Sequence, residues 1–244
     1  MSKKISSIAI LSLLALSVGF LSRSRAADVD SNLSDGFRMV EVASVADAIE
    51  QLYGQRAYMS HEIRPLSPTK FAGPAVTVQM KREENKDGAN GIKGVLDAID
   101  QAPAGSVYVM ELQDGADFAG IGGLMSTAMK VRGLAGAIVD GGVRDLPQIQ
   151  KLQFPVFSRG VVPSTTVNHY RFAGMNIPIH CAGVAVNPGD IVSADLDGVV
   201  VVPKAKAAEI LKKSQELDNS EHTMLPFIEK YKSIGEAVKK FGRI

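Results

Sequence analysis

The chain has 244 residues, of which 45% are hydrophobic and 22% charged, an ordinary globular composition with enough length for one sizeable core. Its single cysteine, Cys181, excludes an intrachain disulfide and a zinc site built from several thiolates. Without positions 1–26, Lys+Arg falls from 27 to 23 against 26 Asp+Glu, a net charge of −3. No nucleic-acid partner is therefore expected, because sequence-independent binding needs basic residues that neutralise phosphates.

The N-terminus has the order of a secretory signal peptide. Lys3 and Lys4 precede an uncharged apolar run over 8–21, and Ser24-Arg25-Ala26 follows. The run is shorter than the roughly 18 to 20 residues of a spanning helix, although an uncleaved anchor is the alternative. We expect a signal peptide over 1–26, a flexible lead-in over 27–36, and an exported, periplasmic or secreted protein without stable membrane association after cleavage.

Helical and strand signals alternate along the first half of the chain. Apolar residues at helical spacing predict a helix over 42–52, with Ser44 as its cap. A strand over 75–80 follows the Gly73-Pro74 turn. The polar run over 81–91 is predicted to be a mobile surface loop, with a lid over the site as the alternative. A helix is expected over 92–99 and a strand over 106–111.

The second half continues the alternation and then changes to β-rich sequence. We expect a helix over 124–131, a buried strand over 136–139 and a helix over 146–152. The run over 184–202 reads as hairpins whose last strand, 199–202, enters the centre of a sheet. The tail over 204–241 is predicted to form two helices broken near Pro226. The order of elements indicates an α/β fold with one domain.

The first candidate site is the glycine pair that opens the helix over 124–131. Gly122 and Gly123 would let the backbone approach a ligand closely, and the helix start, with Leu124 and Met125, presents unpaired N–H groups. Such a helix start attracts a carboxylate or a phosphate. A tight structural turn is the alternative.

The second candidate is the end of the buried strand, where Asp140-Gly141-Gly142-Val143-Arg144-Asp145 follows. Ligands of open α/β folds gather at the carboxyl ends of strands. Arg144 offers a bidentate cation for a carboxylate or enolate oxygen, and Asp145 offers a carboxylate for a hard metal such as Mg²⁺. The alternative is a turn with an exposed Arg144 and with Asp145 as the N-cap of the next helix.

The motifs together resemble the RraA-like 4-hydroxy-4-methyl-2-oxoglutarate aldolases over residues 37–212. The segments that carry the resemblance are Gly122-Gly123-Leu124-Met125, Arg132-Gly133, Ala135-Gly136, 140–145, Phe154-Pro155-Val156-Phe157-Ser158-Arg159-Gly160, Gly183-Val184, Asn187-Pro188-Gly189-Asp190 and 197–203. Weaker matches are Asp47-Ala48 and 73–77. The resemblance implies a single ββα swivelling-type domain in homotrimers or paired trimers. The residues beyond it, 213–244, are expected to form a C-terminal helical extension.

The resemblance also implies roles for individual residues. The 122–125 loop (Gly122, Gly123, Leu124 and Met125) would hold the substrate carboxylate through backbone amides, and Arg144 would bind the keto or enolate oxygen. Asp145 would hold a divalent metal, Mg²⁺ or alternatively Mn²⁺, largely through waters. The expected activity is retro-aldol cleavage of a small 2-oxo acid to pyruvate, with oxaloacetate decarboxylation through the same enolate. The alternative is a non-catalytic protein-binding regulator on the same fold.

One position departs from the family pattern. Aldolases of this family commonly carry an Asp 21 positions before the arginine, where this chain has Gly123. A carboxylate that would order water or metal is therefore missing, whereas Arg144 and Asp145 keep the minimal pair.

Other polar residues are not assigned to the site. His180 and Cys181 should point to opposite faces of a strand, so a nucleophile pair is not expected. Asp195 and Asp197 could be paired carboxylates, but Asp197-Gly198 favours a turn. The four histidines lie far apart and do not suggest a zinc site.

Overall fold

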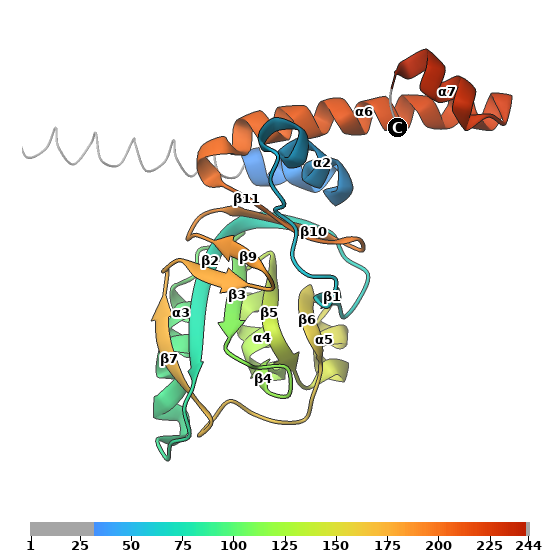
Figure 1. Ribbon diagram of the computed structural model, residues 1–244. Helices are drawn as coiled ribbons and strands as arrows, with labels where there is room; N and C mark the ends of the chain where they lie inside the picture. The colour runs from blue at the N-terminus through green and yellow to red at the C-terminus, as the bar shows by residue number, and fades with distance from the viewer. Residues whose placement is uncertain (1–31, 243–244) are drawn as a thin grey trace, which may run out of the picture.

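The computed structural model describes residues 32–242 (Figure 1), so the predicted signal peptide lies outside the described residues. Residues 32–39 form a helix, which corrects the expectation of a flexible lead-in for positions 32–36. Burial of Phe37 explains the difference, because its side chain packs in the core with residues of α2 and α6. In the described part of the chain, no helix is long and apolar enough to cross a membrane.

Helices and strands alternate as an α/β fold requires. The further helices are α2 (Val42–Tyr53), α3 (Lys93–Gln101), α4 (Gly123–Val131), α5 (Leu146–Leu152), α6 (Ala207–Tyr231) and α7 (Ile234–Phe241), with 3-10 turns at Gly88–Ile92 and Lys204–Lys206. The strands are β1 (Arg64–Pro65), β2 (Phe71–Arg82), β3 (Val107–Leu112), β4 (Ala119–Ile121), β5 (Gly136–Val143), β6 (Val156–Val161), β7 (Tyr170–Met175), β8 (Ile179–Cys181), β9 (Val184–Val186), β10 (Ile191–Asp195) and β11 (Gly198–Val202).

The main sheet has the order β1-β6-β5-β3-β2-β10-β11, and β4 and β7 pair with β5 and β2 respectively. Strands β2, β3, β5 and β6 run parallel, whereas β7, β10 and β11 are antiparallel to their neighbours. Tyr58 bridges to Val200 on β11, and Arg64 pairs with Ser158 on β6. The connection between Tyr58 and Arg64 therefore links the two ends of the strand order and nearly closes the sheet.

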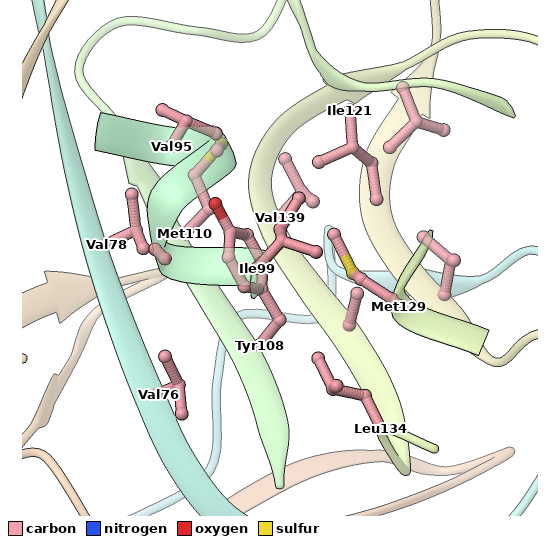
Figure 2. Close-up of a cluster of buried hydrophobic side chains, with 14 of the residues drawn as sticks. Val76, Val78, Val95, Ile99, Tyr108, Met110, Ile121, Met129, Leu134 and Val139 are labelled. Carbon is pink, nitrogen blue, oxygen red and sulfur yellow. The ribbon is translucent and has the colours of Figure 1, made fainter. Parts of the chain in front are cut away.

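Strand alternation divides the interior between the two faces of the central strands. One face packs Tyr108, Met110 and Val139 against α3, α4 and α5 (Figure 2). The other face packs Val109 and Ile138 under the two-stranded β8–β9 sheet. Successive side chains of a strand point to opposite sides, so near-continuous apolar runs bury both faces of the parallel strands.

Helix α2 begins differently from the sequence prediction. Ser44 lies inside α2 and is buried, and it does not cap the helix. Instead, Oδ2 of Asp195 accepts from the backbone N–H of Val42 at 3.0 Å. Oδ1 of Asp195 accepts from the backbone N–H of Asp197, which stabilises the predicted turn into β11. Asp195 therefore has a structural role.

Four other expectations need correction: three about the second half of the chain and one about a loop. Strand β11 is the last in the strand order and not central, although α2 packs on it and buries Val200 and Val202. Helix α6 continues through Pro226 and across position 213, and the break comes after Tyr231. The loop predicted from 81 begins only after Arg82, because β7 extends the pairing of β2. Arg171 of β7 then forms ion pairs with Glu83 and Asp87.

Candidate active site

Arg144 and Asp145 follow directly on the last residue of β5. The strand continues through Val143, beyond the predicted end at 139, because β4 and β6 pair with its final residues. In a parallel sheet this is the carboxyl edge, where α/β folds bind their ligands. The structure thus places both residues where the sequence predicted.

Asp145 occupies the N-cap position of α5 but does not cap that helix. Its backbone lies in the left-handed region, with φ 61° and ψ 37°, and its side chain makes no capping hydrogen bond to α5. Oδ2 instead accepts from the backbone N–H of Gly123, at 2.9 Å. The left-handed conformation is unfavourable for a residue with a side chain, although Asp and Asn tolerate it. The carboxylate is therefore directed to the start of α4.

Gly122 is needed for this close packing, whereas a side chain at Gly123 would require the flexible Gln148 to move. A Cβ on Gly122 would lie 2.7 Å from Oδ2 of Asp145 and 3.0 Å from Cγ of Arg144. On Gly123, a Cβ would lie 3.0 Å from Cγ of Gln148. The 122–125 loop and the Arg144-Asp145 pair therefore form one site. Since the Gly123 N–H already binds Asp145, the N–H groups of Leu124 and Met125 are the ones that remain for a substrate carboxylate.

The Arg144 side chain extends beside the carboxylate of Asp145. Its Nε lies 3.9 Å from Oδ2 of Asp145, and Nη1 donates to the carbonyl of Ser164 at 3.3 Å. The side chains of Arg144 and Asp145 are 45% and 52% exposed. An ion pair this exposed contributes at most about 1 kcal/mol to stability, so the pair leaves both charges accessible to a ligand.

A depression of about 390 Å³ opens at this pair. Its other walls are apolar and come from the first turn of α5 and the end of β6: Leu146, Pro147, Val161, Val162 and Pro163. Leu124, at the start of α4, is 89% exposed, and Val161 is 48% exposed. The site is therefore a shallow cation-and-carboxylate pair with a wide apolar rim.

The donor set at Asp145 fits a hydrated hard cation. Within residues 32–242, no group of three or more His, Cys, Asp or Glu side chains gathers to hold a metal. Mg²⁺ is commonly bound through one or two carboxylates, with waters and substrate oxygens as its other ligands. Asp145 fits that mode, because one of its oxygens takes the Gly123 N–H and the other has no such bond to a backbone amide. A tetrahedral zinc site does not fit.

A second polar arrangement was not assigned a role from the sequence. Gln79, Glu111 and Asp140 occupy paired register positions on β2, β3 and β5, and Arg159 extends the row on β6. The amide Nε2 of Gln79 donates to Glu111 at 3.0 Å, and Nε of Arg159 donates to Asp140 at 2.5 Å. Arg159 also pairs with Glu62. This polar row crosses the face of the sheet opposite α3–α5.

The polar row holds the β8–β9 hairpin. Glu111 accepts from the backbone N–H of His180 at 3.1 Å, and Asp140 accepts from that of Ala182 at 2.6 Å. In the sequence, the row is indicated only by charged residues inside otherwise buried strands. The tertiary structure shows that these residues lie side by side. The row has a structural role, and it includes neither Arg144 nor Asp145.

The side chains around Cys181 agree with the sequence prediction. Cys181 is buried and His180 is exposed on β8, so they point to opposite faces. Burial, with a smaller contribution from the nearby Asp140 carboxylate, raises the pKa of the Cys181 thiol well above its usual value. The thiol therefore stays protonated and does not form a nucleophile pair with His180.

Comparisons with known proteins agree with this fold. Residues 42–201 match the family model described as RraA-like, Aldolase/RraA. A Halalkalibacterium halodurans protein named "Putative 4-hydroxy-4-methyl-2-oxoglutarate aldolase" is 33% identical over 184 residues, which cover 74% of this chain and 80% of that protein.

Two solved structures show the same fold. An uncharacterized protein from Pseudomonas syringae has a TM-score of 0.76 at 26% identity, covering 85% of this chain and 96% of that one. An unusual member of the RNase ES inhibitor RraA family from Streptomyces coelicolor has a TM-score of 0.71 at 29% identity, covering 80% and 96%. The α/β architecture, the continuous family match and the relatives together show that this chain belongs to the RraA-like family.

Proposed function

We propose that the protein is a divalent-metal-dependent carbon–carbon lyase that cleaves 4-hydroxy-4-methyl-2-oxoglutarate or a related 2-oxo acid to pyruvate. The observation that carries the proposal is the position of Asp145. Its side chain does not cap α5, and its backbone is left-handed. Its carboxylate lies beside Arg144 at the rim of the depression. Unfavourable backbone conformations of this kind are concentrated at functional sites.

The Arg144 guanidinium would stabilise the charge that develops during cleavage. When the bond between C3 and C4 of a 2-oxo acid breaks, its electrons move to the C2 carbonyl oxygen and form an enolate. A bidentate cation at that oxygen lowers the barrier, because the charge exists only in the transition state and the intermediate. The N–H groups of Leu124 and Met125 would orient the substrate carboxylate.

Asp145 would hold the divalent cation, Mg²⁺ or Mn²⁺, largely through waters. Bound there, the metal would polarise the 2-oxo group as a Lewis acid. The Gly123 N–H keeps the carboxylate in one orientation beside Arg144. The same enolate arises when oxaloacetate loses CO₂, so we propose decarboxylation as a second activity of this site.

The test is pyruvate release from both substrates with Mg²⁺, measured by coupled reduction with lactate dehydrogenase. Asp145→Asn keeps the shape and the tolerance of a left-handed backbone but removes the charge. Its matched control is Asp114→Asn, because Asp114 is also exposed and left-handed, with φ 50°. Asp145→Asn should lower kcat/KM at least about a hundredfold, whereas Asp114→Asn should not change it. Equal rates for the two variants would reject the proposal.

Arg144 has a matched control on the neighbouring helix. Arg144→Met should lower kcat and leave KM nearly unchanged, because the enolate forms only during the reaction. Arg132→Met changes an exposed arginine at the other end of α4 and should leave both constants unchanged. Calorimetry should also detect Mg²⁺ binding to the wild type and not to Asp145→Asn.

A second copy of the chain would complete the site. The exposed apolar side chains of Leu124 and Val161 beside the depression support a homotrimer or hexamer with the site at a subunit interface. Leu124→Asp should shift the mass measured by light scattering toward the monomer and reduce turnover. A wild type that is monomeric at assay concentrations would contradict this arrangement.

The alternative is a protein-binding regulator on the same fold, favoured by the missing carboxylate at Gly123. It predicts a stoichiometric protein partner, no Mg²⁺ binding and no pyruvate release.

The N-terminal pattern supports export, because the Lys3-Lys4, apolar and Ala26 order is typical of signal peptides. Cell fractionation and mass spectrometry of the mature N-terminus would test this, and a cytoplasmic protein that keeps Met1 would contradict it.

A further inference from the structure

The segment that joins β6 to β7, residues 162–169, runs along the carboxyl edge of the sheet, past the ends of β4 and β5 (Figure 1). The backbone N–H of Val162 donates to the carbonyl of Val143 at 2.8 Å, so the start of this segment lies beside the last residue of β5. Ser164 follows two residues later and is half-buried. It therefore lies next to Arg144, the residue directly after β5.

The hydroxyl of Ser164 is bonded in both directions. Its Oγ donates to the carbonyl of Asp117 at 2.7 Å and accepts from the backbone N–H of Ala119 at 3.2 Å. The loop that carries these groups is itself fixed on β5, because the N–H of Gly142 donates to the carbonyl of Phe118 at 2.9 Å. A hydroxyl has one donor and two acceptor lone pairs, so the two bonds hold the serine side chain in one orientation.

The backbone carbonyl of Ser164 orients the tip of the Arg144 side chain. It accepts from Nη1 at 3.3 Å, and within residues 32–242 this is the one hydrogen bond of that side chain. The contact with Asp145 gives less direction, because Nε lies 3.9 Å from Oδ2, beyond hydrogen-bond length. The stem of the arginine crosses Gly122, where a Cβ would lie 3.0 Å from Cγ. The tip is thus held by Ser164 alone.

An arginine as exposed as Arg144 needs such a support to keep one conformation. Its side chain is 45% exposed, and a long arginine side chain loses much rotamer freedom when it is ordered. A guanidinium has five N–H donors, so the bond to Ser164 leaves donors for a ligand. A displacement of about 1 Å of a positioned group can lower a rate on the order of a hundredfold. The orientation of the guanidinium therefore matters for any reaction that uses it.

We propose that Ser164 is a positioning residue that directs the Arg144 guanidinium toward the enolate oxygen, an inference that rests on the proposed lyase function. The serine acts through its backbone. Its hydroxyl, bonded to Asp117 and Ala119, fixes the carbonyl to which Nη1 donates. Loss of the hydroxyl therefore lowers turnover through Arg144 and leaves Mg²⁺ binding at Asp145 unchanged.

Kinetics of Ser164→Ala test this role. We expect kcat to fall about tenfold and KM to change less than about twofold, because the enolate forms only during the reaction. Ser164→Thr keeps the hydroxyl and should restore most of kcat. In an Arg144→Met background, Ser164→Ala should cause no further loss, since both changes remove the same interaction. A further loss in that background, or a Thr variant as slow as the Ala variant, would overturn the proposal.

A chemical readout separates this inference from the proposed function. Phenylglyoxal modifies arginine side chains, and peptide mass spectrometry measures the rate at Arg144. The rate should rise about threefold or more in Ser164→Ala, because the guanidinium loses a well-held acceptor. Ser106→Ala is the matched control. Its Oγ donates to the carbonyl of Pro103 at 2.6 Å, just before β3 at the opposite end of the parallel strands, so this variant should change neither kcat nor the modification rate.

The outcomes are distinguishable. Unchanged modification of Arg144 in Ser164→Ala would overturn the proposal, and so would an equal loss of kcat in Ser106→Ala. If the wild type releases no pyruvate while modification still rises in Ser164→Ala, the lyase function is wrong and the positioning of Arg144 by Ser164 is supported.

Discussion

The backbone N–H of Gly123 donates to Oδ2 of Asp145 at 2.9 Å, and this bond joins the start of α4 to the residue before α5. The two halves of the predicted motif are 22 residues apart in the chain. The bond also uses one of the amides expected to hold the substrate. The remaining amides, with Arg144 and the free face of Asp145, define what the site can bind.

The first prediction concerns Gly122. In Gly122→Ala the new Cβ would lie 2.7 Å from Oδ2 of Asp145, so the carboxylate and Arg144 must move apart. We expect pyruvate release to fall at least about tenfold, since a small displacement of positioned groups is costly in catalysis. Gly160→Ala is the control, because a Cβ there meets nothing within 4 Å. If both variants retain wild-type rates, the close packing is not required for activity.

The second prediction restores the missing acid. In Gly123→Asp the Cβ would lie 3.0 Å from Cγ of Gln148, whose flexible side chain can move. Retro-aldol cleavage must remove a hydroxyl proton, whereas decarboxylation needs no such base. We therefore expect the retro-aldol kcat/KM to rise about tenfold or more, and oxaloacetate decarboxylation to rise less. Gly123→Asn controls for size, and an equal gain in that variant would contradict a role for the carboxylate.

The third prediction concerns Asp140 and Arg159 in the polar row. Asp140→Ala leaves the Arg159 guanidinium and the Ala182 N–H without this acceptor. We expect the free energy of unfolding to fall by about 2 to 3 kcal/mol. Amide exchange at Ala182 should also accelerate, because the hairpin loses its anchor.

A double-mutant cycle with Arg159→Ala isolates the pair. The coupling should be about 1 kcal/mol or more, since the two side chains are 14% and 28% exposed. Urea unfolding of the four proteins measures it. Additive single effects would show that the two residues act independently.

The fourth prediction follows from the raised pKa of Cys181. In the unfolded chain a thiol ionises near pH 8.5, whereas the buried thiol stays protonated. The contribution of the Cys181 thiol to the free energy of unfolding is therefore fully present below about pH 8.5. Above that pH the free energy of unfolding falls, by at most about 1.4 kcal/mol per pH unit. Urea unfolding at several pH values measures the slope.

Cys181→Ala is the comparison for that slope. The variant should be less stable at every pH, because it leaves a cavity, but its stability should fall less steeply in alkali. Thiol reagents should also modify native wild type far more slowly than the unfolded chain. Rapid labelling of the native protein would contradict the burial of this thiol.

Local patterns were sufficient for most secondary structure and for placing Arg144 and Asp145 after a buried strand. Helices α3, α4 and α5 and strand β3 lie within two residues of their predicted bounds. Strand β5 continues to Val143, and Gly73-Pro74, predicted to be a turn, belongs to β2 and pairs with β10. Errors occurred where distant residues decide the outcome. Asp195, far along the chain, caps α2 in place of Ser44. Pro226 is accommodated within α6, so proline alone did not determine where that helix ends.

The sequence by itself determined the α/β class, the family and the presence of an arginine and a carboxylate at the end of a buried strand, because these depend on local periodicity and on short motifs. It left open whether the side chain of Asp145 caps its own helix. Only the tertiary structure decided this, since the alternative partner, the N–H of Gly123, lies on another helix. The same reason hid the row from Gln79 to Arg159, because strand register places side by side residues that are far apart in the chain.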